Sequence, residues 1–152
     1  ACLLKRDRHN KIVNSLKKMD VKIKFISDGD VSGVIYVVDD KFPVDIYLGI
    51  GGGPEGVLAA AALSCLGGQI QGRLYLNEEQ KIKAKKMGII DYKKKFNIDE
   101  MIKGDVMFFA TGVTNGDLIK GIKDQGEYFE ASTLVLHKDS KTNKIITNKH
   151  KK

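Results

Sequence analysis

Short apolar runs typical of buried strands alternate along the chain with stretches in which apolar residues recur at helical spacing. We predict strands at residues 1–4, 21–26, 44–50, 69–76 and 105–110, and a final hairpin formed by 127–137 and 144–150. Helices are predicted at residues 12–19, 31–38, 54–66, 78–87 and 117–122. Strands that alternate with helices indicate an α/β fold. No repeat or linker divides the sequence, so we expect a single domain over residues 1–152.

The junction between the third strand and the third helix is the most informative stretch. Its apolar run ends in Gly51-Gly52-Gly53, which allows the backbone to approach a ligand closely, and Pro54 then begins an alanine-rich helix. Free N–H groups and the helix dipole make such a junction suitable for an anion. Glu55, in the first helical turn, would repel a bare phosphate. A cation bound between the two would remove this conflict.

Three interpretations of this loop compete. A Walker A loop is excluded because no Gly-Lys-Ser/Thr follows the glycines. A dinucleotide-binding fingerprint is formally present as Gly51-x-Gly53-x-x-Gly56, with Glu78 in place for a ribose contact, although Pro54-Glu55 inside it argues against a pyrophosphate. The simplest interpretation is a tight turn with a glutamate that favours the helix N-terminus.

Polar and charged segments also follow two other predicted strands. Lys5-Arg6-Asp7-Arg8-His9 follows the first strand, and arginines at a strand-to-helix turn can bind phosphate with two hydrogen bonds. Ser27-Asp28-Gly29-Asp30 follows the second, where ligands lie in open α/β sheets. Solvated turns, with Asp30 as a helix cap, explain both segments equally well. At the end of the fifth strand, Thr111, Thr114 and Asn115 could line a site, but turn and cap chemistry explains them equally well.

Composition narrows the function without assigning it. The chain has 152 residues, 42% of them hydrophobic, which is enough for a core, and its apolar runs are too short to span a membrane. The net charge of +7 comes mainly from scattered lysines, and without a recognised motif it does not predict nucleic-acid binding. The chain starts without Met or a signal-peptide pattern, so we expect a fragment from a cytoplasmic protein. Cys65 is expected in the core rather than as a reactive thiol.

Read together, four segments resemble the class II fructose-1,6-bisphosphatases. They are Lys5-Arg6-Asp7-Arg8-His9, Ser27-Asp28-Gly29-Asp30, Gly49 to Val57, and Phe109-Ala110-Thr111-Gly112-Val113-Thr114-Asn115-Gly116-Asp117. The match covers essentially the whole chain and corresponds to the C-terminal half of that family. It departs at Asp7, where Pro is common, and at Gly53, where Ala is usual, and neither change removes a ligand atom.

The resemblance implies part of a layered α/β/α/β/α sandwich and a role in gluconeogenesis. Family members hydrolyse the 1-phosphate of fructose 1,6-bisphosphate with Mn²⁺ or Mg²⁺, and we expect the full-length form to be a homo-oligomer. Carried over by position, Glu55 is a metal ligand. The substrate-binding positions are Arg6, Asp7, Arg8, Asp28, Gly29, Asp30 and Gly52. The acidic Asp-Pro-x-Glu-Gly-Thr-type motif of the family belongs to the half absent here, and one carboxylate cannot hold a two-metal site. We therefore expect the isolated chain to be inactive.

Other classes of function remain open on the sequence alone. A non-catalytic α/β module that binds sugar phosphates is the main alternative to an enzyme. A nicotinamide-binding domain predicts binding of NADH, and a basic nucleic-acid-binding domain predicts salt-dependent retention on DNA. The four matched segments favour the phosphatase family over all three.

Overall fold

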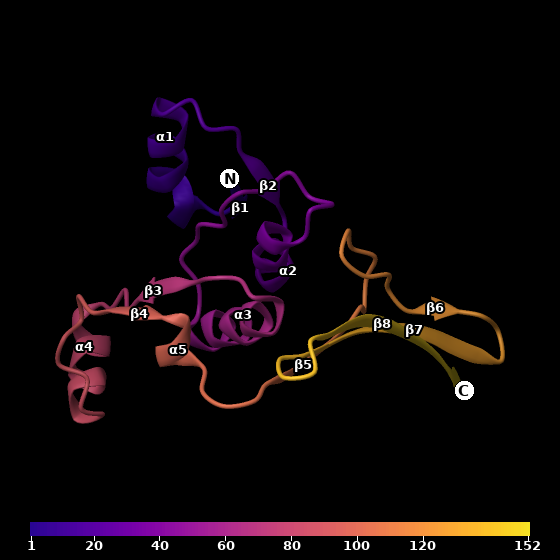
Figure 1. Cartoon of the computed structure of the whole chain (residues 1–152). Helices are drawn as coiled ribbons and strands as arrows, with labels where there is room; N and C mark the ends of the chain where they lie inside the picture. Colours follow the sequence, from indigo (N-terminus) through magenta and orange to yellow (C-terminus); the bar gives the residue numbers. More distant parts are fainter.

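Three short parallel segments form the N-terminal part of the computed structural model, which describes residues 1–152 (Figure 1). β1 (Cys2–Leu4) pairs in parallel with β2 (Lys24–Ile26). On its other side, β1 meets the chain at Tyr47 through one parallel bridge with Cys2. The strand predicted at 44–50 is therefore reduced to a bridge, because only the backbone groups on either side of Tyr47 hydrogen-bond to Cys2. β2 is likewise shorter than the predicted 21–26.

The N-terminal helices lie within a few residues of their predicted bounds. A 3₁₀ turn, η1 (Asp7–His9), leads into α1 (Asn10–Lys18). The ambiguous stretch 31–38 is helical, as α2 (Asp30–Ile35) followed by the 3₁₀ turn η2 (Tyr36–Val38). α3 (Gly53–Leu66) starts at the glycine–proline junction and ends at Gly67, which adopts a left-handed φ of 75°. α1 was predicted from the helical spacing of its apolar residues, and α3 from Pro54 at its start and Gly67 at its end. Asp30, expected to cap α2, is instead its first residue, because Gly29 is the N-cap and no side chain caps this helix.

A small antiparallel unit follows α3. β3 (Gln71–Arg73) pairs with β4 (Lys95–Asn97), and α4 (Glu78–Lys86) lies between them in the chain. α4 opens with a capping box in which the Asn77 and Gln80 side chains each accept from the other's backbone N–H. β4 and the four-residue α5 (Ile98–Met101) were missed, since their short segments lie within a polar stretch.

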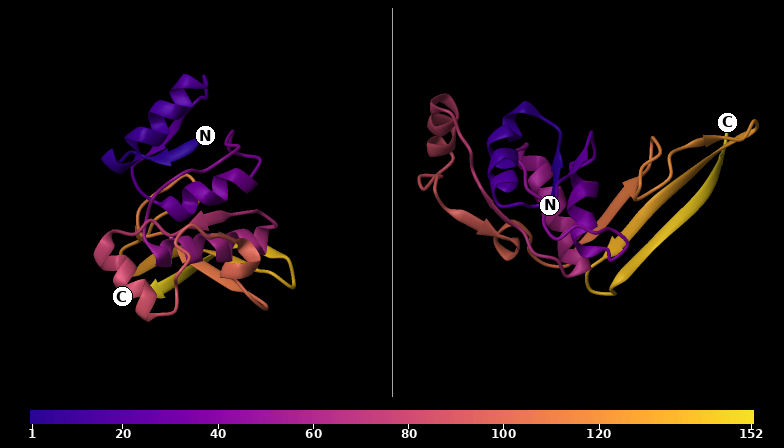
Figure 2. Two further views of the ribbon diagram at one scale, coloured as in Figure 1. Left: turned by 90° about the vertical axis from the view of Figure 1, so that its left-hand side faces the viewer. Right: turned by 90° about the horizontal axis from the view of Figure 1, so that it is seen from above.

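The C-terminal third forms a four-stranded sheet, in which the predicted hairpin is confirmed as β7 (Tyr128–His137) and β8 (Thr142–Lys151). β5 (Met107–Thr111) and β6 (Lys123–Asp124) both pair with the other edge of β7. Figure 2 shows this hairpin extending as an arm away from the helices.

The helix predicted at residues 117–122 was wrong. The chain there is a loop, in which the Gly116 N–H donates to the Ile119 carbonyl at 3.0 Å. A Cβ at Gly112 would collide with the Lys120 carbonyl, and one at Gly121 would collide with the backbone at Thr114. Two glycines thus allow the loop to fold back tightly on itself, and this tertiary closure overrides the local helical signal.

α3 lies at the centre of the hydrophobic core. On one side Ala59, Ala60 and Leu63 pack with Val34 and Ile98. On the other side Ala62 packs in a second cluster with four buried residues, Ile35, Phe108, Leu134 and Leu136. Cys65 lies against this second cluster, as predicted, and burial raises the pKa of its thiol. The arrangement is mixed α/β, as predicted, and none of its helices is both long and apolar enough to cross a membrane.

Candidate functional site

The three polar segments singled out from the sequence emerge from one edge of the parallel unit. β1, β2 and the bridge at Tyr47 run in the same direction, so the chain leaves all three at their carboxyl ends. Residues 5–8, 27–30 and 49–52 follow these ends. In open α/β sheets this edge is where ligands bind. The structure thus brings together residues that are more than forty positions apart in the sequence, as Arg8 and His9 contact the backbone of Ile50.

An ion pair joins the first segment to the second. The Arg6 Nη2 donates to the Asp28 Oδ1 at 2.8 Å, and the Arg6 Nη1 donates to the Lys5 carbonyl at 3.0 Å. The Asp28 side chain is 86% exposed and that of Arg6 38%, so water screens the pair and an incoming anion can compete for the guanidinium. Beside it is a cavity of about 330 Å³, lined by Lys5, Arg6, Asp7, Asn10, Val13 and Phe25.

His9 joins the first segment to the third. It is only 1% exposed. Its Nδ1 lies 2.8 Å from the Leu4 carbonyl, and its Nε2 accepts from the Ile50 N–H at 2.9 Å. A tautomer with its hydrogen on Nδ1 satisfies both contacts. The imidazole therefore fixes the glycine loop against the end of β1.

Arg8 strengthens the same connection from the surface. Its Nε donates to the Ile50 carbonyl at 2.6 Å, while its two Nη groups have no hydrogen-bond partner in the chain. A guanidinium anchored through Nε presents its remaining donors in a fixed plane. This geometry suits a phosphate oxygen at the mouth of the glycine loop.

The second and third segments meet at Asp30 and Gly51. A Cβ on Gly51 would lie 4.0 Å from the Asp30 Oδ2, so the carboxylate lies over the glycine loop. The Asp30 Oδ1 accepts from the Val31 N–H at 2.9 Å, which holds the carboxylate at the start of α2. Gly29 precedes it with a φ of 78°, a left-handed conformation that strongly favours glycine. Of the two acids in the predicted segment 28–30, Asp28 therefore pairs with Arg6 and Asp30 lies over the glycine loop.

Tyr47 forms the floor between these segments. Cβ atoms built on Gly33 and Gly49 would each touch its ring, which shows that the ring lies between the two glycines. Burial raises the pKa of Tyr47 to about 12, with the Asp30 carboxylate adding to the shift and Arg8 opposing it. The hydroxyl therefore stays protonated well into the alkaline range.

Glu55 folds back over the loop from the first turn of α3. A Cβ at Gly52 would collide with the Glu55 Oε2, so the carboxylate occupies the space that any other residue at position 52 would fill. No side chain caps this helix, which leaves backbone N–H groups of its first turn available. The helix dipole stabilises the carboxylate here, and the same end would attract a phosphate.

These residues do not complete a metal site. Mg²⁺ and Mn²⁺ need several oxygen ligands, commonly from more than one carboxylate. No group of three or more His, Cys, Asp or Glu side chains in the structure is arranged to hold a metal ion. Glu55 can contribute one ligand, and the chain supplies no set of acids around it. The metal centre implied by the resemblance therefore does not fit this chain alone.

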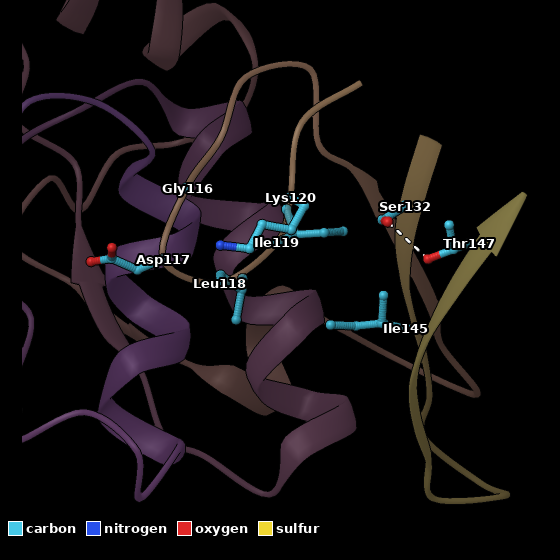
Figure 3. A pocket seen from close by; sticks show the side chains of 8 residues that line it. All are labelled: Gly116, Asp117, Leu118, Ile119, Lys120, Ser132, Ile145 and Thr147. Atoms are coloured by element: carbon cyan, nitrogen blue, oxygen red, sulfur yellow. Dashed lines mark hydrogen bonds between the residues drawn. The ribbon is translucent and has the colours of Figure 1, made fainter. Parts of the chain in front are cut away.

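A second hollow, of about 270 Å³, lies between the loop at 116–120 and the C-terminal sheet (Figure 3). Ser132 and Thr147 line it and hydrogen-bond to each other at 2.9 Å. None of the predicted binding residues lines this hollow. Nearby, Asn115 accepts from the Gly121 N–H at 3.0 Å, which is loop chemistry.

The dinucleotide interpretation is not supported by the structure. It requires Glu78 at the end of a neighbouring parallel strand. Glu78 instead follows β3, which pairs antiparallel with β4 in a separate sheet, and its carboxylate lies 2.6 Å from the Lys81 Nζ.

Sequence reasoning missed two residues that organise the site. His9 was read only as one member of a basic cluster, and Tyr47 only as part of an apolar run. For Tyr47, a hydroxyl-bearing aromatic residue within an otherwise apolar run could have indicated a position at the site. Nothing local distinguished His9, because its partners at Leu4 and Ile50 come together only in the fold.

Comparison with known proteins finds a family and relatives that match nearly the whole chain. A family model described as bacterial fructose-1,6-bisphosphatase, glpX-encoded, matches residues 1–150. A Synechococcus sp. (strain JA-3-3Ab) protein named D-fructose 1,6-bisphosphatase class 2/sedoheptulose 1,7-bisphosphatase is 33% identical over 164 residues, covering 99% of this chain and 47% of the relative. A similarly named Acaryochloris marina (strain MBIC 11017) protein is 32% identical over 162 residues, covering 97% and 47%. The chain thus spans about half the length of the curated relatives it matches.

Proposed function

Because this chain belongs to the family of glpX-encoded bacterial fructose-1,6-bisphosphatases, we propose that it forms the substrate-binding half of an enzyme that hydrolyses the 1-phosphate of fructose 1,6-bisphosphate. The observation that carries the proposal is the meeting of three strand ends through Arg6–Asp28, Arg8–Ile50 and Asp30–Gly51. This half corresponds to the C-terminal part of the family. The products of the reaction are fructose 6-phosphate and phosphate.

Each segment has a separate task in the proposed complex. Arg6 and Arg8 neutralise the phosphate that is not cleaved, and the planar guanidinium of Arg6 can donate two hydrogen bonds to it. Asp28 and Asp30 accept hydrogen bonds from sugar hydroxyls, with Gly29 setting their turn. The backbone at Gly52 contacts the substrate at the N-terminus of α3. Asp7 borders the cavity beside Arg6, where it limits how far the sugar can enter.

Glu55 is the one metal ligand that we assign to this chain, for Mn²⁺ or Mg²⁺. The other ligands are proposed to come from the part of the family fold that this chain does not match. The isolated chain is then expected to bind substrate without turning it over. In the complete protein, the arginines hold the sugar phosphate while the cleaved group lies over α3, close to Glu55.

A phosphate-release assay with Mn²⁺ tests this proposal. A longer parent protein should release phosphate from fructose 1,6-bisphosphate, and its Glu55→Ala form should not. The 152-residue chain should release none, with or without that change. Turnover by the 152-residue chain would show that it holds a complete site. If the parent protein keeps normal activity after Glu55→Ala, the assignment of Glu55 as a metal ligand is wrong.

A non-catalytic sugar-phosphate-binding module is the second candidate, and the missing acidic cluster favours it. The two candidates differ in one expected result. If the chain is a non-catalytic module, a longer parent protein would also release no phosphate. We further propose that the full-length form is a homo-oligomer. Both cysteines are free, which is consistent with a cytoplasmic setting.

A further inference from the structure

A hydrogen-bonded cluster of polar side chains lies at the turn of the C-terminal hairpin. This turn lies beside the start of β5, where the Lys138 N–H donates to the Val106 carbonyl at 2.9 Å (Figure 1). The Cys65 Sγ, near the C-terminal end of α3, donates to the same carbonyl at 3.5 Å. The glycine loop is at the other end of α3, whose 14 residues span about 20 Å. The cluster is therefore separate from the strand-end site.

An aspartate, a histidine and a serine form the centre of this cluster. The His137 Nε2 lies 2.6 Å from the Asp105 Oδ2, and the His137 Nδ1 lies 2.7 Å from the Ser140 Oγ. The tautomer with its hydrogen on Nε2 satisfies both contacts, because it donates to the carboxylate and accepts from the hydroxyl. The imidazole thus occupies the position of a general base between a carboxylate and a serine, which is the arrangement that activates serine nucleophiles.

The surrounding backbone fixes the acid and the base. The Asp105 Oδ1 accepts from the Val106 N–H at 2.8 Å and from the Asp139 N–H at 3.3 Å, which leaves Oδ2 for the histidine. His137 is the last residue of β7 and is paired with β5 on one side and β8 on the other. Its side chain is 25% exposed, so the base is partly shielded from water. A base on a strand paired along both edges keeps its orientation better than one on a loop.

Ser140 is exposed in the turn at residues 138–141 and has the contacts that a nucleophile needs. Its Oγ lies 2.7 Å from the Thr142 Oγ1, so the threonine hydroxyl can donate to it while its own hydrogen points to His137. Lys141, the next residue, has a left-handed φ of 53°, which keeps the turn tight. The Ser140 N–H has no partner among the backbone carbonyls. In serine nucleophiles this N–H stabilises the oxyanion that forms during the attack.

The charge and the exposure of the turn indicate the class of reactant. Lys138, Lys141 and Lys144 lie within four residues of Ser140, and only Asp139 opposes them in that stretch. This positive charge attracts an anionic reactant. Because the serine is exposed, binding contacts contribute little to the rate, so the reactant must itself be activated. An acyl phosphate meets both requirements, since it is negatively charged and its phosphate is a good leaving group.

We propose that Ser140 is a nucleophile that accepts the acyl group of an acyl phosphate. The Ser140 Oγ forms a bond with the carbonyl carbon while the bond between that carbon and the phosphate oxygen breaks. The hydroxyl proton moves to the His137 Nδ1 and then to the departing phosphate. The products are an O-acylated serine and inorganic phosphate, and no oxidant or other reactant is required. Asp105 is a positioning residue, because it holds the histidine in the tautomer that accepts the proton. The proposal is independent of the proposed function.

Acetylation by acetyl phosphate tests the proposal. The 152-residue chain is incubated with acetyl phosphate, and each acetyl group is located by peptide mass spectrometry. Hydroxylamine removes acetyl groups from serine esters and leaves lysine amides, so it separates Ser140 from the many lysines. We expect a hydroxylamine-sensitive acetyl group on Ser140, formed about a hundredfold more slowly after His137→Ala. Ser15 is the matched control and should stay unmodified, because it is also exposed but its Oγ donates to the Lys11 carbonyl at 3.1 Å instead of a histidine.

Two further measurements separate the chemical roles from effects on folding. Added imidazole should restore acetylation of the His137→Ala chain, which an unfolded chain would not allow. Asp105→Asn should slow acetylation about tenfold or more, and the imidazole ¹⁵N shifts should show that His137 no longer keeps its hydrogen on Nε2. An unchanged tautomer would refute the positioning role of Asp105. Acetylation of lysines alone, equal acetylation of Ser15 and Ser140, or no recovery with imidazole would overturn the proposal.

Discussion

Replacement of Gly52 by alanine should separate the function of the glycine loop from its folding. A methyl group at this position would collide with the Glu55 Oε2 and move the carboxylate away from the loop. The backbone itself accepts the change, because Gly52 has φ −71° and ψ 150°, which alanine adopts without strain. The collision is with the end of a flexible side chain, so the fold can absorb it.

The stability change can be bounded from the structure. Alanine in place of glycine restricts the unfolded chain and gains about 0.4–1 kcal/mol. Alanine is also a poorer N-cap than glycine, at a cost of roughly 0.5–1 kcal/mol. The two effects nearly cancel, so the Tm should stay within about 4 °C of the parent. Substrate binding should suffer more, because losing a hydrogen bond to a charged group costs about 1.5–3 kcal/mol, or roughly tenfold or more in Kd.

Calorimetric titration with fructose 1,6-bisphosphate and thermal melting measure these two effects. Gly53→Ala is the matched control, because a Cβ there would meet nothing within 4 Å. It should bind like the parent and melt at the same or a higher temperature. If Gly52→Ala binds as tightly as the parent, the assigned role of the loop is wrong. If it unfolds the protein, the assigned local geometry is wrong.

Three further predictions concern charge and pH. Arg6→Ala should weaken fructose 1,6-bisphosphate binding in calorimetry about tenfold, yet change the Tm by less than about 4 °C, since its pair with Asp28 is exposed; an unchanged Kd would contradict this. The raised pKa of Tyr47, about 12, favours the protonated hydroxyl in the folded state. The free energy of unfolding from urea titrations should therefore fall by up to about 2 kcal/mol between pH 10 and 12, and Tyr47→Phe should lose less. A hydrogen bond from His137 lowers the pKa of Asp105 in the folded protein. The ionised carboxylate therefore stabilises the fold above a pH of about 4, and this stabilisation is lost as the pH falls further. Asp105→Asn should flatten this acid dependence of the free energy of unfolding in urea titrations.

Elements with strong end signals could be predicted from the sequence. α3 has Pro54 at its start and Gly67 at its end, and the hairpin has a polar turn between two alternating runs. The weak elements failed for a physical reason. Residues 117–122 have local helical character, but Gly112 and Gly121 let the loop close on itself, and that closure is set by tertiary contacts.

The site could be predicted in its residue types but not in its contacts. Arginines and glycines at strand ends were compatible with a phosphate site, the family resemblance added a sugar-binding role for the acids, and the structure brings all three segments to one edge. The pairing of Arg6 with Asp28 depends on β1 and β2 being neighbours in parallel, which periodicity does not reveal. The role of His9 depends on a bridge to residue 50 that spans forty-one positions.

The most direct test of the substrate-binding role is amide mapping by NMR. Fructose 1,6-bisphosphate is titrated into the ¹⁵N-labelled 152-residue chain. We predict that the amides of residues 6–8, 28–30 and 52 shift together and saturate at one Kd. Shifts confined to the hollow lined by Ser132 and Thr147, or the absence of any shift, would contradict the claim that the three strand ends form one sugar-phosphate site.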